Sequence, residues 1–530
     1  MSASKEKKNR QASAGMDWSD PKTAREAQQR KEERRSNRMY AAIAIVFVIV
    51  AVVTVVWKTN VIQRTVPAVT INGENYTSAE VNYYYKNIYQ SVISNYYNYL
   101  SYLELDTSAS MKSQKMNSIA ASMLGGTEGE SWYNFFLDTA LNQMCLVRSM
   151  VDAAAKDNFT WSDAMESDFQ DNMDTISKSA TSYGYTVKQY ISLVYGNAMT
   201  QSTLEQAIKD GILAQAYSQN YENSLTYTTD QLTTAYNADP NSYDVVDCQY
   251  VTVSGSPATT DASGNTVDVT DAMKTEAMTK AKTTADSIYA SYKGGKSLSD
   301  LSSANDGTSY SAPTGSTHYD TVLSNWLFDS ARKAGDSAVL EDTSTSNYYV
   351  VVFGSRYRYD YKTVNVRHIL LKIDDSALDS TSATYNSDLQ ALKDTVKAKA
   401  DALLAQWKSG EATEDSFAKL ANENSEDTGS NTTGGLYSQV HKGQMVDAFN
   451  DWCFDASRKA GDTGIVYAER TGSSSDYKGY HIIYFVGEDL PYWQVQVTSQ
   501  LKSDDYNTWQ KNLSADYTAE QHSLGMRFVG

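Results

Sequence analysis

Residues 325–337 read NWLFDSARKAGDS, and residues 451–463 read DWCFDASRKAGDT. Trp, Phe, Asp, Arg, Lys, Ala, Gly and Asp recur in the same register, and each stretch lies ahead of an aromatic-rich, strand-like run. Repetition of this kind indicates that one structural module occurs twice in the chain. The first copy is expected to span about 244–358 and the second about 363–488.

Both copies show the same order of expected elements. A strand-like run comes first, CQYVTVS at 248–254 or VRHILLKI at 366–373. A loop, a helix rich in Lys and Ala, a second short helix and the repeated WxFD helix follow. A Gly-Asp turn then leads into the last strand. Strands and helices in this order favour a small antiparallel sheet with helices packed on it, an α+β module.

The chain as a whole has the composition of a globular protein. It has 530 residues, of which 41% are hydrophobic and 21% charged, so about three or four domains are expected. The net charge is −18, which makes nucleic acid an improbable partner. Its three cysteines, Cys145, Cys248 and Cys453, lie too far apart for a disulfide framework or a CxxC metal site.

The start of the chain differs from the rest. Residues 1–38 hold 11 Lys or Arg and 6 Asp or Glu, which is typical of a solvated basic tail. Residues 39–58 contain the uncharged run AAIAIVFVIVAVVTVV, long enough to cross most of a bilayer of about 30 Å. A cleaved signal peptide is the alternative, but it usually has a shorter apolar stretch and a small-residue cleavage site. An uncleaved anchor is therefore expected, with the tail in the cytoplasm and the remainder outside.

Residues 67–240 are expected to form a mostly helical domain. It begins with AVTINGENYTSAEV at 68–81, a pattern that predicts a strand, an Asn-Gly turn and a helix capped by Thr77 and Glu80. Its many tyrosines have two explanations that the sequence leaves open. They can form a core with an amphipathic rim, or a surface that holds extended polypeptide.

The segment 491–530 is expected to return to this helical domain. Four side chains recur at helical spacing and share one helical face: Tyr506, Trp509, Leu513 and Tyr517. The final MRFV at 526–529 is strand-like and is expected to pair with the lone strand at 68–72.

Few residues in the chain have a pattern that suggests chemistry. Only five histidines are present, and His318, His441 and His522 lack partners at zinc-ligand spacing. Phosphate-binding loops and nucleophile elbows are also missing from the sequence. We therefore expect neither a metal nor a cofactor. The remaining two histidines, His368 and His481, occur only in the second copy, in its first and last strands.

Five motifs of the second copy resemble, in order and spacing, the parvulin-type peptidyl-prolyl cis/trans isomerases. They are VRHILLKI at 366–373, FAKLANENSED at 417–427, GG at 434–435, GQMVDAF at 443–449 and GYHIIYFVG at 479–487. The wider plan, an exported helical domain ahead of such modules, looks like the PrsA and SurA groups of extracytoplasmic foldases.

This resemblance implies roles for individual residues. It makes His368, Asp427 and His481 the polar catalytic set, and Met445 and Phe449 the apolar pocket for the substrate proline. Tyr437 and Val440 are added as substrate-binding residues from the loop at 434–440. That loop reads GGLYSQV where bacterial relatives usually read GGDLGWF, so Val440 replaces an aromatic residue and the shape of the pocket is expected to differ.

The first copy departs further from the family pattern. Tyr250 takes the place of His368, Tyr348 that of His481, Tyr319 that of Met445 and Leu323 that of Phe449. We interpret this copy as a non-catalytic module kept for structure or for client binding.

Three hypotheses for the whole chain follow. The favoured one is a membrane-anchored extracellular foldase that binds secreted polypeptides and isomerises their X-Pro bonds without a covalent intermediate. The first rival is a chaperone whose parvulin folds are both inactive. A tyrosine-rich surface adhesin is the other rival, and it does not explain why only one copy has the two histidines.

Overall fold

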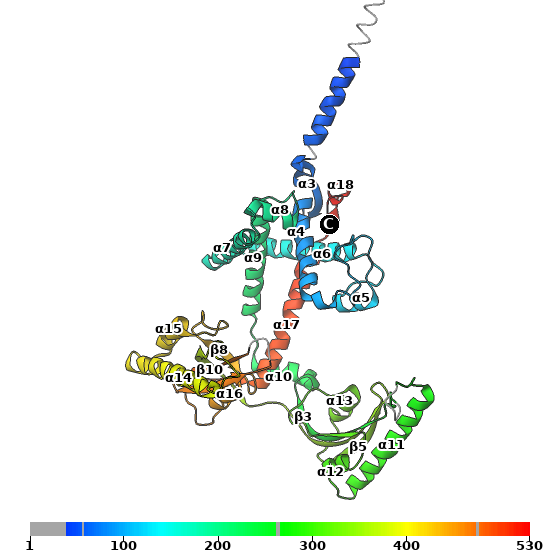
Figure 1. Cartoon of the computed structure of the whole chain (residues 1–530), viewed down its shortest axis with the longest axis vertical. Coiled ribbons are helices and arrows are strands. Elements are labelled where there is room, and N and C mark those ends of the chain that lie inside the picture. The colour runs from blue at the N-terminus through cyan, green and yellow to red at the C-terminus, as the bar shows by residue number, and fades with distance from the viewer. Residues whose placement is uncertain (1–38, 56–57, 261–265, 473–475) are drawn as a thin grey trace, which may run out of the picture. The chain divides into compact units, whose positions relative to one another are not determined.

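The structure is a computed structural model that describes residues 39–55, 58–260, 266–472 and 476–530. The expected basic tail at 1–38 lies outside these ranges. The chain divides into two compact units. We name the unit that ends at Leu225 and resumes from Asp505 to Gly530 the helical unit, and Thr226–Asp504 the twin-module unit (Figure 1).

The N-terminal apolar run is only partly described. Residues 39–55 are helical and their side chains are exposed. The next two residues, 56 and 57, belong to the expected span but not to the described part of the chain. Within the described ranges, the structure contains no helix that is both long and apolar enough for a membrane crossing.

The helical unit combines a bundle of helices with one small sheet. Strands β1 and β2 are joined by a tight turn in which Asn72 and Gly73 both have positive φ, 49° and 83°. Helix α4 then starts with a capping box, in which the Glu80 carboxylate accepts from Thr77 N at 2.7 Å. The turn and the cap predicted from the sequence are thus confirmed. The helices and strands of this unit up to Leu225 are α3 (Val61–Thr65), β1 (Pro67–Ile71), β2 (Glu74–Thr77), α4 (Ser78–Asn95), the 3-10 helix η1 (Tyr97–Tyr99), α5 (Ser118–Leu124), α6 (Trp132–Lys156), α7 (Asp163–Ser182), α8 (Val187–Tyr195) and α9 (Gln201–Ser224).

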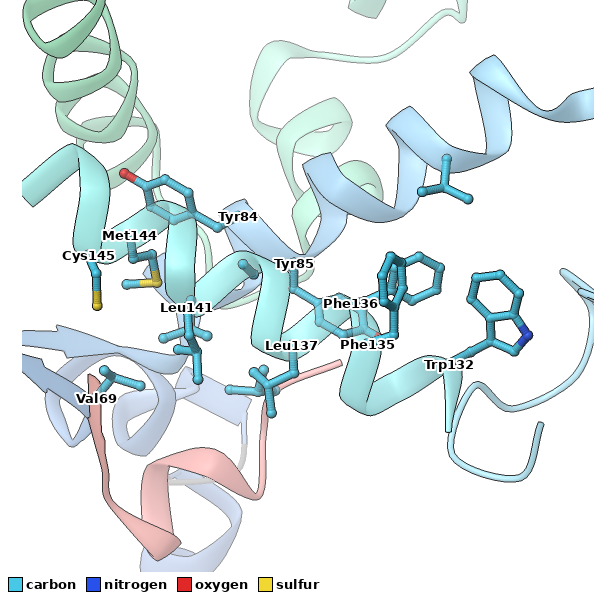
Figure 2. Packing of buried hydrophobic residues seen from close by; sticks show 14 of the residues in the cluster. Val69, Tyr84, Tyr85, Trp132, Phe135, Phe136, Leu137, Leu141, Met144 and Cys145 are labelled. Carbon is cyan, nitrogen blue, oxygen red and sulfur yellow. The ribbon is translucent and has the colours of Figure 1, made fainter. Parts of the chain in front are cut away.

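The core of the helical unit lies between α4, α6 and the small sheet (Figure 2). Aromatic rings on α6 pack edge to face and tilted against rings on α4; the Tyr85 and Phe136 centroids, for example, are 5.9 Å apart. Buried aromatic side chains of this size contribute about 1.5–3 kcal/mol each through removal from water. Cys145 is buried in the same core as a free thiol.

Tyrosines of the helical unit occupy both kinds of position that the sequence left open. Tyr84 and Tyr85 are buried in the core. Beyond the end of α4, Tyr97, Tyr99 and Tyr102 are 72%, 54% and 65% exposed. Tyr84 and Tyr85 thus belong to the core of the first explanation, and the exposed tyrosines are compatible with either a rim or a polypeptide-binding surface.

The C-terminal segment completes the small sheet of the helical unit. Strand β11 (Ala519–Gln521) pairs antiparallel with β1, so that the strand order is β11-β1-β2. Val529 is buried in the core of the unit. The prediction that MRFV at 526–529 forms the pairing strand is wrong, because the short helix α18 (Ser523–Met526) ends within it. The chain pairs with β1 through the less apolar residues just before that helix.

Helix α17 (Tyr492–Ser514) contributes to both units. Its first half belongs to the twin-module unit, where Trp493 and Val497 are buried with Leu232 and Tyr243. Its second half belongs to the helical unit, where the Trp509 ring stacks on Tyr221 of α9 at a centroid distance of 4.2 Å. The boundary between the two units therefore lies at residue 505 and not at the predicted residue 491. Each half of α17 packs through an apolar face of its own, which explains this position.

Two glycines of the helical unit are expected to respond oppositely to alanine. A Cβ on Gly525 of α18 would lie 2.4 Å from Pro67 O and 2.5 Å from Ala68 Cα, whereas a Cβ on Gly211 of α9 meets nothing within 4 Å. Gly525→Ala should lower the free energy of unfolding of this unit by about 2 kcal/mol. Gly211→Ala should raise it by about 0.5–1 kcal/mol, since glycine destabilises a helix interior.

Both changes in the free energy of unfolding can be measured by urea denaturation of the full chain, with hydrogen exchange of the α6 amides as the readout. Equal stability of the two variants would contradict the close packing of α18 on β1.

The twin-module unit contains two four-stranded antiparallel sheets of identical strand order. The order is β4-β3-β6-β5 in the first module and β8-β7-β10-β9 in the second. The expected repeat and the α+β class with small antiparallel sheets are thus confirmed. Before the modules come α10 (Thr229–Ala238) and the 3-10 helix η2 (Pro240–Ser242). The first module comprises β3 (Val245–Ser254), α11 (Asp271–Lys293), α12 (Leu298–Ser303), β4 (Thr308–Ser311), α13 (Thr321–Leu327), β5 (Ser337–Asp342) and β6 (Asn347–Tyr357), and the second comprises β7 (Lys362–Lys372), α14 (Tyr385–Ser409), α15 (Glu414–Asn424), β8 (Leu436–Val440), α16 (Asp447–Cys453), β9 (Thr463–Arg470) and β10 (Tyr477–Pro491).

Each face of the second sheet packs against different helices. Ile369 and Leu371 of β7 point to α14 and α15 and pack there with Trp407 and Phe417. Alternate residues of the same strand, such as Val366, point to the other face and pack against α16. Because side chains alternate along a strand, His368 lies on the α16 face.

Candidate active site

The two histidines of the second module meet on neighbouring strands. In the antiparallel pair β7 and β10, Leu370 lies opposite His481, and His368 lies opposite Ile483. Both imidazoles therefore project from the same face, where each residue is 4% exposed. Their rings stack with a centroid distance of 5.3 Å, and the two Nδ1 atoms lie 3.1 Å apart.

Asp427, in the loop after α15, completes the cluster. Its Oδ2 atom lies 2.9 Å from His368 Nε2 and accepts hydrogen bonds from Ser430 Oγ at 2.5 Å and Tyr437 Oη at 3.0 Å. The hydrogen bond from His368 holds the pKa of the Asp427 carboxyl far below its ordinary value, although partial burial opposes this. Asp427 is therefore an anion at neutral pH and can only accept hydrogen bonds.

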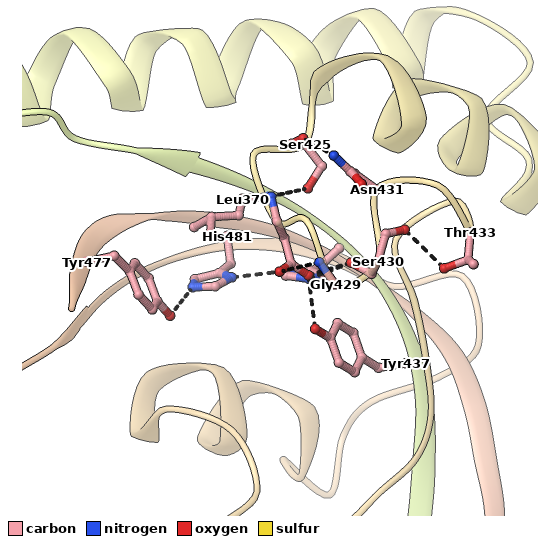
Figure 3. A network of polar contacts seen from close by, with 11 residues as sticks. Leu370, Ser425, Gly429, Ser430, Asn431, Thr433, Tyr437, Tyr477 and His481 are labelled. Atoms are coloured by element: carbon pink, nitrogen blue, oxygen red, sulfur yellow. Dashed lines mark hydrogen bonds and ion pairs between the residues drawn. The ribbon is translucent and has the colours of Figure 1, made fainter. Parts of the chain in front are cut away.

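Backbone contacts fix this loop against β7. Glu426 N donates to Leu370 O at 2.9 Å, and Leu370 N donates to Ser425 Oγ at 3.1 Å. Figure 3 shows Ser425 joined to Leu370 beside the cluster. Gly435 O accepts from His368 N at 2.9 Å, and a Cβ on Gly435 would lie 2.2 Å from His368 O. The paired glycines are thus required for the loop to approach the strand.

Tyr477 extends the polar network at its other end. Its hydroxyl lies 2.9 Å from His481 Nε2 (Figure 3). Burial, together with the neighbouring His368 ring, lowers the pKa of His481 to about 3, so this imidazole is neutral at physiological pH. The neutral His481 ring has one acceptor nitrogen and one N–H donor, so its Nε2 can accept from the Tyr477 hydroxyl while its Nδ1 faces His368.

A cavity of about 410 Å³ opens above this network. Met445 and Phe449 form part of its apolar wall, and the Phe449 ring packs edge-on against both imidazoles at 5.5 and 5.3 Å. The residues around the cavity come from β7, β8, β9, β10, α16 and the loops between: His368, Leu370, Asp427, Tyr437, Gln444, Met445, Val446, Phe449, Arg470, Tyr477 and His481.

Six of the seven site residues predicted from the sequence line this cavity. Val440 does not, because it is fully buried at the end of β8 and packs with Val364 and Val366 in the core. Its prediction as a substrate-binding residue is corrected accordingly. Tyr477 and Ser430, which bond directly to the network, were not predicted. Tyr477 could have been found from its position four residues before His481 on the same strand face.

Tyrosines fill the corresponding region of the first module. Tyr250 of β3 and Tyr349 of β6 pack edge to face, with centroids 6.0 Å apart. Tyr349 bonds to Asp320, and Tyr319 donates to Val246 O at 2.9 Å. In the first module Tyr349 lies opposite Thr252, and in the second module His481 lies opposite Leu370. Thr252 follows Tyr250 by two residues, just as Leu370 follows His368. Tyr349 is therefore the counterpart of His481.

The prediction of Tyr348 as that counterpart is wrong by one position. A shift of one residue reverses the face of a strand, and Tyr348 packs in the cluster on the opposite face of the sheet.

The second module combines an apolar cavity with a fixed anion and a polar chain beneath it. Across the described part of the chain, no group of three or more His, Cys, Asp or Glu side chains is arranged to hold a metal ion. The groups present can grip an apolar ring and place a negative charge beside a carbonyl group.

Comparison with known proteins places this module in a family. Residues 353–485 match the model of the PPIC-type PPIase domain. A comparison with curated protein sequences gives no match.

The similar solved structures include several PrsA proteins. The peptidylprolyl isomerase PrsA from Bacillus anthracis is 21% identical, with 30% of this chain and 58% of that chain covered and a TM-score of 0.17. The PrsA protein from Bacillus cereus is 23% identical over 30% of this chain and 50% of that chain, also with a TM-score of 0.17. This chain therefore spans between half and three fifths of these two proteins. The foldase PrsA from Streptococcus pneumoniae is 11% identical, with coverage of 71% and 81% and a TM-score of 0.20.

The order of the sheet, the histidine pair with its aspartate and the matching family model lead to one conclusion. The second module of this chain is a peptidyl-prolyl isomerase domain of the PPIC, or parvulin, type.

Proposed function

We propose that this chain is a membrane-anchored foldase outside the cytoplasm, which binds secreted polypeptides and isomerises their X-Pro bonds at residues 363–488. The observation that carries this proposal is the anionic Asp427, held by His368 at the floor of a cavity whose wall includes Phe449. An X-Pro bond isomerises slowly because a barrier of about 18–20 kcal/mol protects the planar amide. The catalyst has to favour the twisted amide over the planar one.

Charge at the carbonyl oxygen supplies part of this preference. In the planar amide, resonance places negative charge on that oxygen, and twisting the bond removes it. The Asp427 carboxylate beside the oxygen would therefore repel the planar form more than the twisted form. Met445 and Phe449 would hold the proline ring while the preceding residue rotates. No bond to the enzyme forms.

The helical unit would hold the unfolded substrate. Its exposed tyrosines beyond α4, Tyr97, Tyr99 and Tyr102, offer rings that bury against an apolar segment and hydroxyls that remain solvated. The first module, with its corresponding site filled by Tyr250 and Tyr349, would serve structure or client binding without catalysis.

The proposed location of the protein is inferred from the sequence near the N-terminus. The uncharged run within residues 39–58 follows a basic segment, a pattern that favours a signal anchor with the following domains outside. Resistance of the protein to extraction from membranes by alkaline carbonate tests this part of the proposal, and full extraction would exclude the anchor.

Acceleration of a proline-limited refolding reaction tests the enzymatic proposal. Uncatalysed isomerisation takes about 10–100 s, so the full chain at catalytic concentration should shorten the slow phase visibly. A refolding protein that lacks prolines is the control, and its rate should not change. A slow phase equal to that in buffer, with a folded second module, would exclude isomerase function and leave the non-catalytic chaperone.

A further inference from the structure

One arginine of the second module, Arg470, lies at the cavity and forms no hydrogen bond or ion pair within the described part of the chain. Arg470 is the last residue of β9, is exposed, and lines the cavity together with His368 and Asp427. In the sheet it lies opposite Tyr477, whose hydroxyl bonds to His481. Its guanidinium is therefore next to the polar network and open to solvent.

The other arginines of this module are engaged. Arg367 forms an ion pair with Glu414 at 2.8 Å, and Arg458 donates to Trp452 O at 2.9 Å. Arg470 makes no hydrogen bond or ion pair with any residue in the described ranges. Its neighbour Glu469 points to the opposite face of β9, where its Oε1 atom bonds to Tyr467 and Lys393.

The two charges at the cavity differ in what they can still bind. Among the described residues that line it, Arg470 is the one permanent cation and Asp427 the one carboxylate. Asp427 Oδ2 already accepts from His368, Ser430 and Tyr437, and its Oδ1 accepts from Gly429 N at 3.3 Å. Both oxygens of the anion thus already accept hydrogen bonds, whereas the five N–H donors of the guanidinium have no acceptor among the described residues.

We propose that Arg470 determines specificity by binding a carboxylate, so that preferred substrates carry Asp or Glu immediately beside the isomerised proline. The planar guanidinium matches a carboxylate with two parallel hydrogen bonds. Acidic residues outnumber basic ones in the module, so its overall field repels such peptides and the preference has to come from Arg470 itself. This inference rests on the proposed isomerase function of the same cavity.

Blocked peptides that differ in one side chain test the assignment. One series is acetyl-Ala-Xaa-Pro-Ala-amide and the other acetyl-Ala-Ala-Pro-Xaa-amide, with Glu, Gln or Lys as Xaa. For each peptide and the full chain, NMR exchange gives kcat/KM and titration gives Kd. In one of the two series, kcat/KM should be about fivefold higher for the Glu peptide than for the Gln peptide. A difference of this size is expected of a single solvent-accessible ion pair. The preference should shrink as salt is added.

Substitutions of Arg470 are compared through the Glu-to-Gln ratio within each variant, so that any general change in activity cancels. Arg470→Gln should bring the ratio to about one, and Arg470→Glu should favour Lys over Gln. Lys408→Gln is the matched control, because it removes one exposed positive charge at the end of α14. It should retain the Glu preference.

Two outcomes separate this inference from the isomerase function. Equal values for Glu and Gln peptides in both series, or a preference that survives in Arg470→Gln, would overturn the role of Arg470. Absence of turnover for every peptide, combined with Glu-dependent binding that Arg470→Gln abolishes, would instead reject the isomerase function and retain the role of Arg470.

Discussion

Replacement of Asp427 by alanine is expected to lower kcat/KM for prolyl isomerisation by about 100-fold, comparable with the loss of one preorganised hydrogen-bond donor from an active site. The variant loses the negative charge beside the substrate carbonyl. It also loses the acceptor that His368, Ser430 and Tyr437 share. Exchange of a proline peptide followed by NMR measures the rate. Suppression of aggregation of an unfolded protein should remain, because the helical unit is unchanged.

The repeat supplies a matched control for this variant. Asp320 of the first module bonds to Tyr349, the counterpart of His481, and Asp320→Ala should leave the isomerase rate unchanged. Asp427→Asn separates charge from packing, since the amide keeps the size of the side chain without its charge. A rate for Asp427→Ala within twofold of the original protein would show that the anion has no part in catalysis.

Deletion of residues 515–530 is expected to destabilise the helical unit by at least about 3 kcal/mol. This segment supplies β11 and the buried Val529, whose transfer from water alone is worth about 1.5–3 kcal/mol. Without β11, the outer edge of β1 loses its hydrogen-bond partners, and Ala68 and Val69, now fully buried, become accessible. Hydrogen exchange should show faster opening of α6 and unchanged protection of β7 and β10.

Glu520→Ala is the control for the deletion, because Glu520 is exposed on β11 and does not belong to the hydrophobic core of the helical unit. It should leave the exchange of α6 unchanged. Protection of α6 that is equal in the deleted and the complete chain would show that the unit is stable without its last strand.

The repeat and the site motifs could be predicted from sequence because they are local patterns with strict spacing. The order of strands and helices in both modules follows from the periodicity of the chain, and the paired strands then bring His368 and His481 together. The structure also places Asp427 against His368, as the resemblance implied, and the roles of these three side chains remain predictions that the variants above test.

Other features depend on contacts that no local pattern contains. Tyr348 and Tyr349 are adjacent tyrosines in one strand, and only the register with β3 decides which of them occupies the place of His481. The position of Val440 in a motif predicts a pocket residue, yet β8 turns its side chain into the core. Arg470 belongs to no motif, and its place at the cavity depends on the hairpin formed by β9 and β10.

The position of the last strand has a consequence for the time course of synthesis. Thr70 and His522, which bond beside the β1–β11 pair, are 452 residues apart in the chain. At about 5–20 residues per second, β1 exists for roughly 20–90 s before its partner is made. The twin modules are complete before that moment, and their folding shortens the loop that has to close. The strand made early thus remains an unpaired edge until the C-terminal segment has been synthesised, so the helical unit can complete its folding only at the end of synthesis.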